Sequence, residues 1–415
     1  MPPEIMGLIF TLSLSRYDPP YYTYDSAPWI VSAVCADWRT IASTPTLWTT
    51  ISDSDQYFNG ANLESQLARS GDLPLDIHFH CEDNESGMSD FELEVFTILA
   101  QHTERWQTVN FSATEDAYAV IQRAKPQFSM LRKLVIEVYY EHDSRRLRQS
   151  YLKMFSSAPR LEEVSVNAEL MDCPTALVLP WHQLRRYQSA IEWERIPALA
   201  SATNLIECCL SMSDDKPANL NLKTVHLPLL LRLSVTQHGL LSYLDTPALL
   251  ELYHHDTMAN HSLNDLDFFR RLPRGLKKLV LASGSSLDSI DLDLAGIAEA
   301  LPALQSFGCT QVLPMDSVQL FLRSLSKRPV AFEHISLTLR SPGGRDIITL
   351  VDFVDGMVGK GWCLQSLMVL HPSAEDSEGV LSKVEALRAR GVDIQVMRHS
   401  WPFYTGLVPV GLRID

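Results

Sequence analysis

Short apolar repeats dominate the hydrophobic pattern of the central and C-terminal chain. A string whose first, fourth and sixth positions are apolar begins at Trp106 and last recurs at Leu364. Successive starts differ by between 19 residues (Leu230 to Leu249) and 32 residues (Phe332 to Leu364). Alternation over so few residues is typical of a strand. The other strong strings start at Leu131, Leu161, Leu205, Leu230, Leu276, Leu304 and Phe332, and weaker copies start at Leu184 and Leu249.

Helical patterns or loops separate the strings, and a proline often stands just before a string, as Pro302 does before Leu304. A unit of one strand and one helix cannot bury its own apolar face, so neighbouring units must stack. The period therefore predicts an irregular right-handed α/β solenoid, with the first, fourth and sixth positions pointing inward. The alternative is a doubly wound α/β domain, which gives similar alternation but fewer and less equal units.

The segments on either side of the strings also show regular patterns. Ahead of them we expect a helix over 62–70 that stops at Gly71, a strand over 73–80, and a helix that follows a Ser89/Glu92 capping box. After the last string we expect a helix over 380–390, a strand over 392–396, and an aromatic tail from His399 that covers the end of the solenoid.

The N-terminal pattern is helical. Ile5, Leu8, Ile9 and Leu12 repeat as one stripe of a helix that begins at a proline. A second stripe runs from Ile30 through Val31, Val34, Cys35 and Trp38 to Ile41 and is broken at 43–45, just before Leu47 and Trp48. Three short helices cannot bury so many large side chains among themselves, so part of this surface must meet another chain or the rest of this one.

The first 51 residues resemble the F-box motif in the order and spacing of about ten positions. The matching residues are Pro2, Glu4, Ile5, Ile9, Phe10, Val34, Cys35, Trp38, Arg39, Leu47 and Trp48. The chain departs from the family at 16–27, where the connection between the first two helices is longer than usual. Met1 also stands where the family usually has a leucine after preceding residues, which is consistent with a natural chain that begins upstream.

This resemblance implies docking to the Skp-type adaptor of cullin–RING ubiquitin ligases. By the same resemblance the adaptor contacts are Pro2, Ile5, Ile9, Val34 and Trp38, and Leu47-Trp48 fixes the last helix. The strings resemble the leucine-rich repeats that commonly follow an F-box, although the asparagine that usually closes each turn is missing. The expected organisation is an F-box-like domain over 1–52, a lead-in over 53–104, a leucine-rich-repeat-like solenoid over 105–398 and a capping tail over 399–415.

Composition narrows the possible partners. The chain has 415 residues, 46% of them hydrophobic, and a formal net charge of −15, so a nucleic-acid groove is not expected. The sequence has neither a secretory signal pattern nor an apolar run of membrane-spanning length, so no membrane partner is expected. Seven cysteines, mostly among apolar neighbours, indicate reduced thiols in the cytoplasm or nucleus.

Candidate chemistry is sparse. The sequence has no phosphate-cradle motif, H-E-x-x-H, paired C-x-x-C or G-x-S-x-G. The pairs His78/His80 and His254/His255 read more simply as polar positions of a strand and a loop than as metal ligands. We therefore expect no enzyme activity, cofactor or metal, although a triad need not be contiguous.

With no catalytic motif found, the expected activity is binding of another protein. Positions between the inward residues would line the exposed sheet face and bind a target protein, since mixed charge with scattered tyrosine suits a protein partner. The residues expected there are Lys133, Tyr139, Glu163, Arg186, Arg232, Tyr253, His255, Lys278 and His334. The sequence thus predicts a substrate receptor of a cullin–RING ligase; the alternative is a repeat scaffold without a ubiquitin role, whose N-terminal helices only cap the solenoid.

Overall fold

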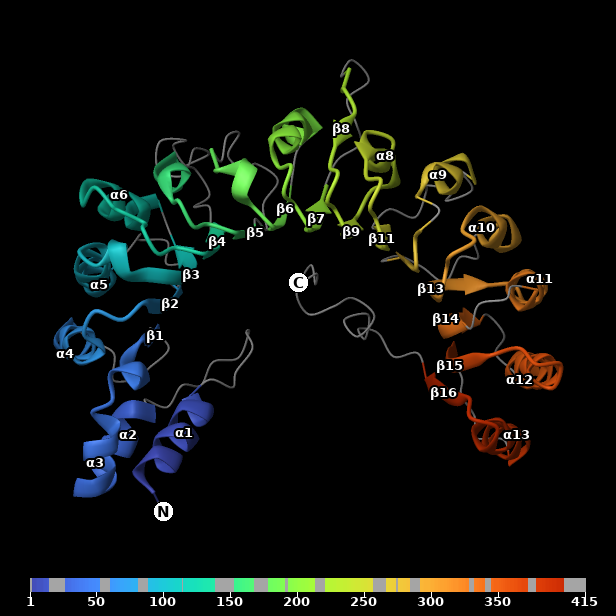
Figure 1. Cartoon of the computed structure of the whole chain (residues 1–415), viewed down its shortest axis with the longest axis horizontal. Helices are drawn as coiled ribbons and strands as arrows, with labels where there is room; N and C mark the ends of the chain where they lie inside the picture. The colour runs from blue at the N-terminus through green and yellow to red at the C-terminus, as the bar shows by residue number, and fades with distance from the viewer. Residues whose placement is uncertain are drawn as a thin grey trace. The chain divides into compact units, whose positions relative to one another are not determined.

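The structure is a computed structural model with two compact units, Met1–Ala190 and Ile191–Asp415. It describes residues 2–14, 27–52, 60–80, 89–113, 115–138, 153–167, 178–190, 193–212, 221–256, 266–273, 275–283, 292–327, 332–339, 345–371 and 378–398. Both units are mixed α/β, and each is built on parallel strands (Figure 1).

The first unit begins with helices and continues as a ladder of strands. Helices α1 (Pro3–Leu14), α2 (Ala27–Val34) and α3 (Ala36–Ala42) precede the 3₁₀ turn η1 (Pro45–Trp48). The strands β1 to β6 then pair side by side in chain order, all parallel. Their bounds are β1 (Thr50–Ser52), β2 (Leu75–His80), β3 (Trp106–Ala113), β4 (Lys133–Val138), β5 (Glu163–Asn167) and β6 (Arg186–Ala190).

Helices or 3₁₀ turns connect these strands. They are α4 (Gly60–Ser70), α5 (Asp90–Ala100), η2 (Thr103–Arg105), α6 (Glu115–Arg123), η3 (Lys153–Ser157) and η4 (Trp181–Gln183). The helix predicted over 62–70 is confirmed, and it ends at Gly71, whose φ of +59° is a conformation that suits glycine. The predicted capping box is confirmed: Ser89 Oγ accepts from the Glu92 amide at 3.2 Å, and the Ser89 amide donates to Glu92 Oε2 at 2.6 Å.

The second unit continues the same design. Its main strands are β7 (Glu207–Ser211), β9 (Arg232–Val235), β11 (Glu251–Asp256), β12 (Lys278–Ser283), β13 (Ser306–Leu313), β14 (Phe332–Leu339), β15 (Leu364–His371) and β16 (Asp393–Arg398), paired in that order and all parallel. Two short strands, β8 (Val225–His226) and β10 (Leu244–Asp245), form a separate parallel pair. The sequence did not predict this pair, because two residues carry no alternation.

The helices of the second unit alternate with its strands. They are η5 (Trp193–Ser201), α8 (His238–Leu241), α9 (Leu266–Arg271), α10 (Leu294–Ala300), α11 (Met315–Ser326), α12 (Arg345–Val358) and α13 (Glu378–Ala389). In each unit the described helices that connect successive strands lie along one side of the strands (Figure 1). A doubly wound sheet has helices on both faces and a strand order that reverses. In this chain the main strands pair in chain order and the connecting helices lie on one side, so the fold is solenoid-like.

The core lies between the strands and these helices. The first, fourth and sixth positions of all nine strong strings are buried, as the sequence predicted. The two weaker copies are buried as well, and each has a polar sixth residue, Ser189 and His254. The segment 53–104 supplies β2, which pairs with both β1 and β3, so this segment is continuous with the repeats.

The predicted second helix is interrupted. Instead of one helix through Ile41, α2 ends at Val34 and α3 begins at Ala36. The residue between them, Cys35, has extended backbone, and its Sγ accepts a hydrogen bond from the Trp38 amide at 3.4 Å. A thiol thus takes the position that usually belongs to serine, threonine or aspartate. The predicted capping tail, 399–415, lies outside the described residues.

Candidate functional site

The N-terminal helices have a small aromatic core of their own. Phe10 from α1 and Leu47 and Trp48 from η1 are buried together. The Trp38 ring lies tilted against Phe10, with 5.0 Å between the ring centroids, and the Trp29 ring meets Trp48 edge-on at 4.8 Å. Four short elements therefore share one packed centre, and Leu47 and Trp48 occupy the packing position expected for them.

Trp48 also attaches this segment to the first repeat. Its indole Nε1–H donates to the Ala42 carbonyl at 2.6 Å. The Arg69 guanidinium, from α4, lies 4.3 Å from the Trp48 ring centroid and 4.6 Å from that of Trp29. Gln66 Nε2, also from α4, donates to the Thr50 carbonyl at 2.6 Å. Cation–π and hydrogen-bond contacts thus hold the helical segment against α4.

The opposite side of the helices is apolar and exposed. Six aliphatic side chains of α1 and α2, between 43% and 56% exposed, form what we call the α1–α2 apolar surface: Ile5, Leu8, Ile9, Leu12, Ile30 and Val34. The stripe seen in the sequence is therefore the outward face of α1, while Phe10 turns inward. Exposed aliphatic residues gathered on two short helices are typical of a protein-binding surface.

The predicted adaptor contacts divide into two groups. Pro2, Ile5, Ile9 and Val34 are exposed, and the repeats do not cover them. Trp38 is only half-exposed, because its ring packs on Phe10. The structure adds Leu8, Leu12 and Ile30 to the exposed set. Their signal was present in the sequence, since all three belong to the two helical stripes.

On the repeats, the predicted target-binding residues form rows of alternating charge. In the first unit Lys133, Glu163 and Arg186 stand in register on neighbouring strands, and Arg186 Nη1 lies 2.9 Å from Glu163 Oε1. In the second unit Glu207, Arg232, Glu251 and Lys278 stand in register.

Arg232 is the centre of the second row. Its Nη1 donates to the Glu207 carboxylate, and its Nε lies 3.6 Å from Glu251 Oε1. The Glu207 side chain is only 9% exposed, whereas that of Arg232 is 39% exposed. Parallel strands bring each residue beside its counterpart, so opposite signs on successive strands neutralise one another.

The predicted exposure of Tyr253 is wrong. The sequence placed it on the exposed face, but it is buried. Its hydroxyl donates to Glu251 Oε2 at 2.7 Å, and Lys278 Nζ lies 5.0 Å from the ring centroid. Burial, together with this hydrogen bond, raises the pKa of the Tyr253 phenol. The ring follows the expected alternation, but alternation assigns a side chain to a face without saying whether that face is covered.

The remaining predicted face residues lie as follows. Lys133 and Arg186 are exposed, and His255 is half-buried. His334 Nδ1 lies 3.1 Å from Ser366 Oγ on the next strand, and burial, with the nearby Lys278 ammonium, lowers the pKa of His334 against an opposing effect of Asp393. Tyr139 lies outside the described residues.

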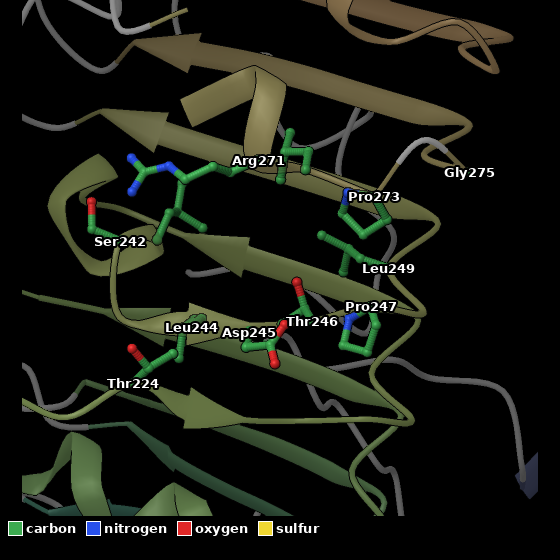
Figure 2. Close-up of a pocket in the computed structure, with 12 residues that line it drawn as sticks. Thr224, Ser242, Leu244, Asp245, Thr246, Pro247, Leu249, Arg271, Pro273 and Gly275 are labelled. Atoms are coloured by element: carbon green, nitrogen blue, oxygen red, sulfur yellow. The ribbon is translucent and has the colours of Figure 1, made fainter. Parts of the chain in front are cut away.

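A cavity of about 550 Å³ lies in the second unit, beside β10 and the end of α9 (Figure 2). Its charged lining residues are Asp245 and Arg271, both exposed. No histidine or cysteine is among the described residues that line it, and His226 nearby binds Asp245 Oδ2 through Nδ1 at 2.7 Å on the surface.

The described part of the chain contains no group of three or more His, Cys, Asp or Glu side chains able to hold a metal ion. Among its helices, none combines the length and apolar character needed to cross a membrane. Of its cysteines, Cys208, Cys209 and Cys309 are buried and Cys35 and Cys363 are exposed, and none of these five forms a disulfide.

Comparison with known protein families and with curated proteins finds no match to this sequence. The residues and their geometry alone therefore carry the functional argument.

Proposed function

We propose that this protein is the substrate-recognition subunit of an SCF-type cullin–RING ubiquitin ligase. In this proposal the N-terminal helices are an F-box that docks the Skp-type adaptor, and the leucine-rich-repeat-like units hold a target protein. The protein performs no chemistry itself and acts in the cytoplasm, the nucleus or both. It promotes ubiquitin transfer by raising the effective concentration of the target near the charged conjugating enzyme.

The α1–α2 apolar surface carries this proposal. A cap that only closed a solenoid would turn its apolar stripe towards the repeats. Here the aromatic core of the helices faces η1 and α4, while Ile5, Ile9 and Val34 face away. Exposing this many aliphatic side chains is unfavourable in an isolated chain, by about 25 cal/mol for each Å² that a partner could bury. This arrangement favours a separate subunit as the cover, with Pro2 at its edge.

Binding to a purified Skp-type adaptor tests the proposal. The informative variant is Ile9→Glu/Val34→Glu, because both side chains are exposed and the buried aromatic core stays intact. A change at Trp38 would be less informative, since its ring packs on Phe10. We expect the intact protein to bind and the double variant to lose affinity by about 30-fold or more, the effect of removing a hot spot of about 2 kcal/mol.

The matched control is Leu320→Glu, which places the same charge on another aliphatic residue, 54% exposed, on α11 of the second unit. This variant should bind the adaptor like the intact protein. Lack of binding by the intact chain, or equal binding by all three proteins, would leave the alternative of a repeat scaffold without a ubiquitin role.

A further inference from the structure

The helix layer of the second unit is thin at one place. Helix α8 has four residues and α9 has six, whereas α11, α12 and α13 have between 12 and 14. Consecutive helices from α9 to α13 contact one another, but among the described elements α8 and α9 share almost no contact. The cavity of about 550 Å³ lies at this place and is lined by residues of both short helices (Figure 2). Its volume is typical of a site for a small ligand.

The buried part of the lining is apolar apart from one hydroxyl. Leu241, Leu249 and Leu272 are buried. Thr246 is 8% exposed, and its hydroxyl has no hydrogen-bond partner within the described part of the chain. Figure 2 shows this hydroxyl pointing towards the middle of the ring of lining residues. Buried polar groups nearly always have partners, so a ligand in the cavity should bring a group that hydrogen-bonds to Thr246.

The rim of the cavity favours an anion. Figure 2 shows its two charged residues, Arg271 and Asp245, on opposite sides of the ring. The Asp245 carboxylate already has a partner, because His226 Nδ1 lies 2.7 Å from its Oδ2. The Arg271 guanidinium has five N–H donors in a planar fork, which matches the two oxygens of a carboxylate. Arg270, next to it on α9, adds a second positive charge.

We propose that this cavity binds the carboxylate end of an acylated apolar amino acid. The carboxylate pairs with Arg271, the apolar side chain lies on the three buried leucines, and the amide hydrogen-bonds to the Thr246 hydroxyl. A phosphate dianion fits less well, because Asp245 on the rim repels a second negative charge. Each part of the lining thus has a matching part in the ligand.

This chemistry has two sources, the C-terminus of a polypeptide and a free N-acyl amino acid. Both carry an apolar side chain between an amide and a carboxylate, and they differ in what continues beyond the amide. The lining residues Thr224, Ser242 and Pro247 are exposed, so the cavity opens to solvent and a longer chain has a way out.

A ligand-observed NMR titration of the intact chain tests the site. The probes are the N-acetyl derivatives of leucine, phenylalanine and methionine, each as the free acid and as the uncharged amide. We expect at least one acid to bind saturably with a Kd of about 1 mM or below, the range for ligands this small, and its amide to bind at least about tenfold more weakly. Absence of saturable binding by all three acids up to about 10 mM, or equal binding of acid and amide, would overturn the proposal.

Two arginine variants locate the binding. Arg271→Gln should weaken the acid at least about tenfold and so remove most of its preference over the amide, whereas Arg271→Lys, which keeps the charge, should recover part of it. The matched control is Arg270→Gln, which removes the same charge from an exposed residue of α9 outside the lining. This control should change the affinity less than about threefold, because salt screens a charge outside the cavity. Equal losses in Arg270→Gln and Arg271→Gln contradict the proposal, since they would show general attraction of anions only.

An acetylated tetrapeptide that ends in the best-bound amino acid, with a free carboxylate, separates the two sources. Binding at least about tenfold tighter than that of the N-acetyl amino acid assigns the site to a polypeptide C-terminus, and equal or weaker binding assigns it to a free N-acyl amino acid. The site goes beyond the ubiquitin role and does not depend on it. Because no adaptor is present in these titrations, failure of the F-box proposal leaves their results unaffected.

Discussion

Single side chains decide which part of the N-terminal segment remains exposed. Trp48 contacts the Ala42 carbonyl, the Trp29 ring and the Arg69 guanidinium, which come from three different elements. This packing fixes the inward side of α1 and α2. Exposure of Ile9 and Val34 is therefore a consequence of an ordered core behind them, and these side chains are presented in a defined position.

His78 makes folding stability depend on pH. Burial lowers the pKa of this β2 imidazole below 6.5; the Lys133 ammonium acts in the same direction, and the Asp76 carboxylate opposes both. The neutral ring is favoured in the folded chain, so the stability it contributes is present above pH 6.5 and is lost as the pH falls towards the folded pKa.

We expect the free energy of unfolding to fall between pH 7 and pH 5.5, and to fall less in the His78→Gln variant. The difference is at most about 1.4 kcal/mol per pH unit for one proton. Urea unfolding followed by circular dichroism at several pH values measures it. Parallel pH curves for the two proteins would show that His78 is not responsible.

At the scale of elements, the sequence predicted the strands because burial on one face imposes a period of two. It missed the break at Cys35, because the apolar stripe continues through that residue and a thiol is not a usual helix cap. It missed the burial of Tyr253, because the Lys278 side chain that lies over this ring comes from the neighbouring strand and is brought there only by folding. The contacts of Arg69 with two indole rings were equally unreadable, since they join residues brought together only by folding.

The rows of charged residues should stabilise the pairing of neighbouring strands, and a substitution of Arg232 tests this. Arg232→Met removes the ion pair between Arg232 and the Glu207 carboxylate, which is only 9% exposed. We expect a loss of about 2 kcal/mol, less than the 3–5 kcal/mol of a fully buried pair because Arg232 is 39% exposed. Arg186→Met, which breaks the more exposed pair with Glu163, should cost at most about 1 kcal/mol.

The double variant Glu207→Gln/Arg232→Met separates the contribution of the ion pair from that of side-chain packing. Removing the Glu207 charge as well should restore more than half of the loss seen in Arg232→Met, as measured by urea unfolding. Additive losses in the double variant would mean that the two side chains act independently.

At the scale of the whole molecule, the loss of stability caused by a substitution should be confined to the strands around it. Among the described elements of the second unit, each main strand pairs with its neighbours in the ladder, and consecutive helices from α9 to α13 contact one another. In such repeat architectures the free energy is close to a sum of unit terms and neighbour terms. A sheet made of successive strands can then open in one part while the rest stays folded.

Leu279→Ala in β12 tests this locality. Its side chain is fully buried, so truncation should cost about 2–5 kcal/mol. Amide hydrogen exchange should rise at least about tenfold in β11, β12 and β13, and clearly less in β15 and β16, because each 1.4 kcal/mol corresponds to one factor of ten. Lys277→Ala, an exposed neighbour, serves as the control. An equal rise from β7 to β16 would show that the unit unfolds as one block, and partial opening of the sheet would then have no physical basis.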